Sequence, residues 1–262
     1  MKFRKIILSF ILMLGISTGA AASSQASSTP NFDPEKVANF AKKVEKELAA
    51  KGARVFILAR VGRPESELPS GIKYTHTAFG VYSNIQTDDG RTIPGYTIYN
   101  LYQREDRKDI SDLIVDYPVD FFMGVHELRA GIIIPKPELQ RRLLKVIGSN
   151  TYKALHNSNY SVIANPFNSK FQNCTEHTLD VINAAIYGTS DRKILKTAAK
   201  EHFKPQEISV NPFKLIFGSM FTEDVALSDQ DDDAIQTTTF TTIAQYLNEN
   251  NLLDEEFVVT AE

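Results

Sequence analysis

The segment Phe171-Gln-Asn-Cys-Thr-Glu-His177 contains the only cysteine of the 262-residue chain, Cys174. An irregular stretch rich in asparagine and serine precedes it, and apolar residues at helical spacing follow it. We therefore expect a helix that begins at the cysteine and ends at Gly188. Far upstream, Thr75-His-Thr-Ala-Phe-Gly-Val-Tyr82 places His76 at the start of an apolar run that predicts a strand. A lone thiol at a helix start and a histidine at a strand start are the two halves of a cysteine nucleophile and its base.

The positions of these two residues predict their chemistry. A thiol attacks as its thiolate, and the free N–H groups at a helix N-terminus favour that form, so we expect a lowered pKa for Cys174. His76 would take the thiol proton and later return it to the leaving group. A third polar group usually fixes the tautomer of such a histidine. Antiparallel folding of the hairpin brings Asn100 or Gln103 back beside His76, with Asn100 the first choice.

The N-terminus carries an export pattern. Three basic residues among the first five precede an apolar run that is too short to span a membrane, and small residues follow it. This pattern predicts a signal peptide over residues 1–22, and hence a periplasmic or secreted protein with no transmembrane anchor after cleavage. Residues 23–32, rich in serine, alanine and proline, predict a disordered leader.

Composition limits the remaining possibilities. An apolar share of 42% is enough for a core, and we expect residues 33–262 to form one domain with a C-terminal helical extension. Without the signal peptide, 26 basic residues face 32 acidic ones, which disfavours nucleic acid as a partner. A single cysteine excludes an intramolecular disulfide.

The order of predicted elements is irregular, which favours an α+β fold over a regular βαβ array. We expect helices over residues 33–52, 137–147, 174–187, 190–202, 212–221 and 243–250, and strands over residues 54–61, 74–82, 96–103, 129–134 and 160–164. Residues 105–125 mix charges and aromatics and predict an irregular excursion.

No metal or cofactor is expected. His126, His156 and His202 lack the mutual spacing of zinc ligands. The acidic run Asp229–Asp233 lacks the glycine and distal glutamate of a calcium loop and predicts a solvated loop. His177 lies one helical turn after the cysteine, where it could compete with His76 as a partner of the thiol, although an exposed surface position is the ordinary expectation.

The stretch Thr-His-Thr-Ala-Phe-Gly-Val-Tyr, followed far downstream by Asn-Cys-Thr-Glu-His, resembles the permuted NlpC-like branch of papain-fold cysteine hydrolases. Lecithin retinol acyltransferase-like proteins share this order of histidine strand and cysteine helix. The resemblance covers residues 74–187 in outline, and the whole chain also resembles exported bacterial families labelled as domains of unknown function. It implies a papain-like core in which a cysteine-bearing helix packs on an antiparallel sheet, with extra helices. It also implies Cys174 as nucleophile, His76 as base and Asn100 as the orienting group.

The leading interpretation is thus an exported cysteine hydrolase of the amidase or peptidase type that acts through an acyl-cysteine intermediate. Cell-wall peptide is the candidate substrate expected in that compartment, and an acyl substrate is a further option. The alternative is a catalytically silent papain-fold module that binds a peptide, a lipid or a partner protein.

Overall fold

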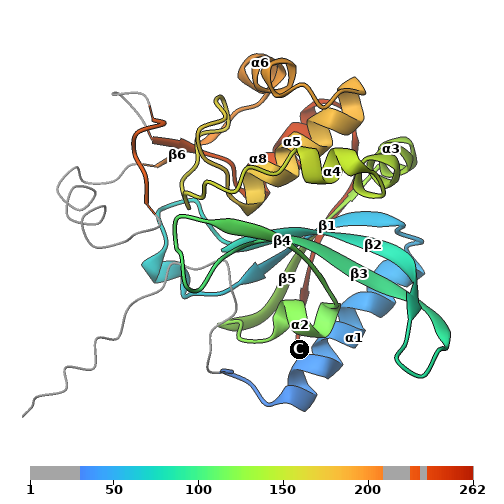
Figure 1. The fold of residues 1–262 in the computed structure, drawn as a ribbon. Helices are drawn as coiled ribbons and strands as arrows, with labels where there is room; N and C mark the ends of the chain where they lie inside the picture. The colour runs from blue at the N-terminus through green and yellow to red at the C-terminus, as the bar shows by residue number, and fades with distance from the viewer. Residues whose placement is uncertain (1–29, 209–224, 231–234, 262) are drawn as a thin grey trace, which may run out of the picture.

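The structure is a computed structural model that describes residues 30–208, 225–230 and 235–261. These residues form an α+β arrangement with one six-stranded antiparallel sheet and seven α-helices (Figure 1). The expected signal peptide, most of the expected leader and the expected helix at residues 212–221 lie outside the described residues. Within the described part of the chain, no helix has the length and apolar character needed to cross a membrane.

The sheet has the strand order β4-β3-β2-β1-β5-β8, and every neighbouring pair is antiparallel. Its strands are β1 (Val55–Val61), β2 (His76–Gln86), β3 (Thr92–Gln103), β4 (Ser111–Asp116), β5 (Glu127–Pro135) and β8 (Leu253–Thr260). A short pair, β6 (Gln206–Ile208) with β7 (Ile235–Thr237), stands apart from it. The β2–β3 hairpin and β1 at the centre of the sheet position the candidate site.

Helices cover both faces of the sheet, as Figure 1 shows. The first face packs against α1 (Pro34–Ala50) and the short α2 (Pro118–Phe122). The second face packs against α3 (Pro137–Ile147), α4 (Asn150–Ala154), α5 (Cys174–Tyr187) and α8 (Phe240–Glu249), and α6 (Arg192–His202) packs against α5. Because side chains alternate along a strand, even-numbered β2 residues such as Ala78 face α1 and α2, whereas Phe79 faces α5.

Local signals explain where the helices begin and end. The Asp33 side chain caps α1 by accepting a hydrogen bond from the Glu35 N–H at 2.8 Å, and Gly52 follows the helix with φ of 65°. The cysteine helix α5 ends in the same way at Gly188, with φ of 66°. Both were expected from the sequence, as was the β2–β3 hairpin.

Three expectations are wrong. The chain does not end in a helical extension, because β8 follows α8 and pairs with β5 at the sheet edge. Residues 105–125 are not merely irregular but contain β4 and α2. Residues 160–164 form no strand; they contribute one isolated bridge, from Tyr160 to Gln172, and continue as turns. The strands β4 and β8 depend on long-range pairing, which is invisible to local sequence patterns.

Candidate functional site

Cys174 is the first residue of α5, and Asn173 caps the helix. The Asn173 side-chain oxygen accepts hydrogen bonds from the Glu176 N–H at 2.8 Å and from the Thr175 hydroxyl at 2.9 Å. Its amide nitrogen donates to the Val162 carbonyl at 2.9 Å, which joins the cap to the preceding loop. The Asn-Cys pair therefore sets the cysteine rigidly at the first turn.

The thiol of Cys174 is buried rather than open to a cleft. Its residue is 6% exposed and packs with Leu101 and Tyr160. Burial raises the pKa of Cys174, and this effect outweighs the backbone N–H groups and the nearby Arg60 cation, which favour the thiolate. The expectation of a lowered thiol pKa is therefore wrong for this closed arrangement, because desolvation is stronger than the helix terminus.

One of the N–H groups that contact the thiol belongs to Thr77, the residue after His76. This donor is available because β2 and β3 pair only from Phe79 and Tyr99 onward, so the two strands separate before Thr77 is reached. The sulfur thus lies at the gap between the strand ends, immediately beside the backbone of the histidine strand.

The His76 side chain lies on the other face of the sheet, towards α2. Its ring stacks on Tyr102 with centroids 4.7 Å apart and contacts Phe121 at 5.6 Å. Nε2 is 3.0 Å from Oδ1 of Asn100, and Nδ1 makes no hydrogen bond. Burial, followed by the charge of Arg60, holds the pKa of His76 well below its ordinary value, although the Asn100 hydrogen bond opposes them.

The structure brings Asn100, and not Gln103, to His76. Asn100 is fully buried and shares the α2 face of the sheet with His76 and Ile98. Gln103 has the opposite parity on β3, and its amide nitrogen donates instead to the Lys108 carbonyl at 2.8 Å. Strand alternation therefore chooses between the two residues that counting across the turn left open.

The candidate nucleophile and base lie towards different faces of the sheet. His76 and Asn100 are hydrogen-bonded to each other, whereas no hydrogen bond joins the thiol to the free Nδ1 of the ring. With the pKa of the thiol raised and that of the imidazole lowered, the proton rests on sulfur and the pair is neutral in this state.

Three residues at the site were not identified from the sequence. Arg60 lies opposite His76 on β1 and donates to the Phe121 carbonyl oxygen. Tyr102 on β3 and Asp116 on β4 are joined by a hydrogen bond of 3.1 Å from the Tyr102 hydroxyl. Only the sheet register brings these side chains together. The one sequence signal that could have found them is the alternation of side chains between the two faces of the sheet, followed through four strands in register.

His177 is not on the surface. It is 2% exposed, and its ring packs against Tyr152 at 4.9 Å and His156 at 6.3 Å. Burial lowers the pKa of His177 to about 3. The expectation of an exposed position was wrong because α5 is covered on nearly every side.

A buried ionic group supports α5 behind the cysteine. Lys196 of α6 lies 2.5 Å from Oε1 of Glu176 and 2.8 Å from Oδ1 of Asp180. Gln172 adds a hydrogen bond of 3.0 Å to Asp180. Burial raises the pKa of Glu176 to about 8. This group ties α5 to α6 and to the loop in front of the cysteine.

Asp229 also departs from the solvated loop that was expected. It is 7% exposed, and its carboxylate accepts a hydrogen bond of 2.8 Å from the Asn165 N–H. The neighbouring Gln230 donates to the Ile163 carbonyl at 2.7 Å. Residues 226–230 thereby hold the loop that precedes Cys174, while Asp231 to Asp233 lie outside the described residues.

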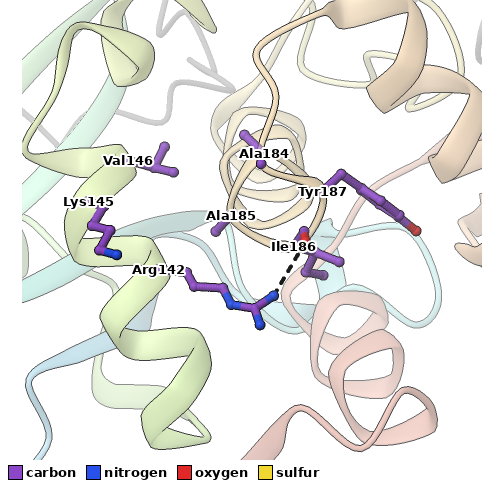
Figure 2. A pocket seen from close by; sticks show the side chains of 8 residues that line it. Arg142, Lys145, Val146, Ala184, Ala185, Ile186 and Tyr187 are labelled. Atoms are coloured by element: carbon purple, nitrogen blue, oxygen red, sulfur yellow. Dashed lines mark hydrogen bonds between the residues drawn. The ribbon is translucent and has the colours of Figure 1, made fainter.

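An open cavity lies elsewhere. A cavity of about 340 Å³ is formed between α3 and the C-terminal end of α5, the end opposite Cys174 (Figure 2). Arg142 and Lys145 extend from α3, and Arg142 donates to the Ile186 carbonyl at 3.5 Å.

No group of three or more histidine, cysteine, aspartate or glutamate side chains in the described ranges is arranged to hold a metal ion.

Comparison with known proteins identifies a family but no characterised relative. No curated protein and no solved structure matches the chain. A family model described as "Uncharacterized protein conserved in bacteria" matches residues 47–247, a span that includes His76, Asn100 and Cys174. The chain therefore belongs to the DUF2145 family of uncharacterized proteins conserved in bacteria.

Proposed function

We propose that the protein is an exported cysteine hydrolase with a papain-like, permuted NlpC-like core. In this proposal Cys174 is the nucleophile, His76 the base and Asn100 the group that orients the base. The observation that carries it is the hydrogen bond between Asn100 and Nε2 of His76. This bond leaves Nδ1 of His76 without a partner. The next residue along the strand, Thr77, donates its backbone N–H to the thiol of Cys174.

The chemistry follows from these positions. Nδ1 of His76 takes the proton of Cys174, and the thiolate attacks the carbonyl carbon of an amide, ester or thioester. The developing oxyanion accepts hydrogen bonds from N–H groups at the start of α5. The imidazolium then protonates the leaving group, whose bond to the carbonyl carbon breaks to give an acyl-cysteine. Water, deprotonated by the same ring, hydrolyses the acyl-cysteine and restores the thiol.

Turnover in this proposal requires the cover of the thiol to move. Cys174 is 6% exposed and packs with Tyr160, and the loop that carries Tyr160 is held by residues 226–230. Displacing this loop would hydrate the sulfur and remove the desolvation that keeps it protonated. Because the expected signal peptide directs export, a cell-wall peptide is the substrate class we favour, with an acyl substrate as the other option.

A second candidate function is a catalytically silent papain-fold module that binds a peptide, lipid or partner protein. The neutral, buried thiol favours it, since burial raises the pKa of Cys174 and no hydrogen bond connects the sulfur with His76. A reactive cysteine ordinarily lies in a partly exposed, electropositive environment.

Labelling of the thiol distinguishes the two functions. Cys174 is the only cysteine, so iodoacetamide incorporation measured by intact mass reports on this residue alone. For a hydrolase, His76→Ala should slow labelling at pH 7 by about tenfold or more, because the base no longer helps to form the thiolate. His202→Ala, at an exposed position on α6, is the matched control and should not change the rate. Equal rates in the wild type and His76→Ala would refute the hydrolase proposal.

A further inference from the structure

Acceptors on two sides hold the Asn100 amide in one orientation. Its nitrogen donates to Oδ1 of Asp116 at 2.8 Å and to the Ile98 carbonyl at 3.2 Å. Turning the amide over would set its oxygen against both acceptors, and acceptors repel one another. The amide oxygen therefore has to face Nε2 of His76, 3.0 Å away.

This orientation decides which nitrogen of His76 carries the proton. An amide oxygen only accepts hydrogen bonds, so Nε2 must be the donor. In the neutral imidazole Nδ1 then keeps its lone pair, and Nδ1 is the ring nitrogen that makes no hydrogen bond. A general base needs that lone pair on the nitrogen directed at its proton donor.

Asp116 is itself fixed by the surroundings of His76. Its second carboxylate oxygen accepts a hydrogen bond of 3.1 Å from the Tyr102 hydroxyl, and the ring of Tyr102 stacks on His76 with an interplanar angle of 19°. On β4, Asp116 lies directly opposite Ile98 of β3, two residues before Asn100. The Asp116 carboxylate is thus linked to the imidazole of His76 through two residues. Asn100 contacts the edge of the imidazole ring, and Tyr102 contacts its face.

We propose that Asp116 is a positioning residue whose carboxylate fixes the amide of Asn100 and thereby keeps His76 in the Nε2–H tautomer, with Nδ1 free to act as the base. This inference rests on the proposed function, in which His76 serves Cys174. Asp116 acts through Asn100 and takes no part in the proton transfer itself.

The test reads the tautomer directly. In ¹⁵N-labelled full chain, long-range ¹H–¹⁵N spectra distinguish a protonated ring nitrogen from a bare one, and His76→Gln assigns the signals of this ring among the five histidines. The wild type should show a protonated Nε2 and a bare Nδ1. Asp116→Ala should shift His76 towards a mixture of tautomers, and Asp116→Asn, which keeps an acceptor for Asn100, should restore the wild-type pattern. Asp112→Ala, an exposed acidic neighbour on β4, is the control and should leave the pattern unchanged.

Asp116→Val also removes the acceptor and replaces Asp116→Ala if that variant fails to fold. A wild-type pattern in either folded variant would overturn the proposal, as would a bare Nε2 in the wild type or an equal shift in Asp112→Ala. The spectra need neither substrate nor a reactive thiol. If His76→Ala leaves labelling of Cys174 unchanged while the tautomer still depends on Asp116, the hydrolase proposal fails and the effect of Asp116 on His76 stands.

Discussion

Acid should destabilise this protein through His177, a buried histidine on the cysteine helix. In the folded state burial lowers its pKa to about 3 from an ordinary value of 6.5. Between these two values the unfolded chain binds a proton that the folded chain does not. The free energy of unfolding therefore falls as the pH drops below 6.5.

The size of the effect follows from the two pKa values of His177. Each pH unit in this window is worth about 1.36 kcal/mol, so the 1.5 units between pH 6.5 and pH 5 correspond to about 2 kcal/mol. His76, whose pKa is also lowered by burial, adds a loss of the same sign. Substituting His177 should thus remove only its own share of the acid sensitivity.

Urea unfolding at pH 7.5 and pH 5 measures this share. The chain has no tryptophan, so far-UV circular dichroism is the suitable signal. We expect the difference in unfolding free energy between the two pH values to be about 2 kcal/mol smaller in His177→Phe than in the wild type. The exposed His202→Gln serves as the control and should keep the wild-type difference. A wild-type difference in His177→Phe would show that the folded state accommodates the charged ring, and the reasoning from burial would be refuted.

Three further outcomes are expected. Leu179→Ala should lower the free energy of unfolding by roughly 2–4 kcal/mol because it opens a cavity in the fully buried face of α5, whereas Cys174→Ala should lower it by about 1–2 kcal/mol. Equal losses in chemical unfolding would identify the thiol as an ordinary core group. Lys196→Met should cost roughly 3–5 kcal/mol at neutral pH because it leaves two buried carboxyl groups of α5 without their cation, and a loss below 1 kcal/mol would contradict this. Asn100→Ala should slow iodoacetamide labelling of Cys174 by less than the roughly tenfold expected for His76→Ala if the hydrolase proposal holds, because the base remains but loses its fixed orientation, and an unchanged rate would remove Asn100 from it.

Local sequence signals predicted the elements that carry the candidate site. The cap at Asn173 and the stop at Gly188 define α5, and the apolar run after His76 defines most of β2. These features depend on neighbours within one or two turns of helix, or on alternation within one strand. The sequence contains that information directly.

Features that depend on register could not be predicted in this way. The edge strands β4 and β8 carry several acidic residues, and only their pairing with β3 and β5 makes them strands. Counting across the turn left Asn100 and Gln103 both in reach of His76, and the pleat of β3 decides between them. The contact of Arg60 with the site likewise requires the β1–β2 register. Burial of His177 depends on how many helices surround α5, which no single segment encodes.

The way the site is assembled bears on the choice between a hydrolase and a silent module. Arg60 favours the thiolate of Cys174 but disfavours the imidazolium of His76, so its charge does not by itself move the proton from sulfur to nitrogen. Desolvation disfavours the charged form of both groups and keeps the pair neutral. At the gap between β2 and β3 the sulfur meets the backbone of the histidine strand, because the Thr77 N–H contacts it there. Hydration of that gap would relieve the desolvation that raises the pKa of Cys174. Two results together would therefore indicate an enzyme whose thiol is buried at rest rather than a binding module. Labelling of Cys174 should accelerate when the loop that carries Tyr160 is destabilised, and the accelerated labelling should still depend on His76.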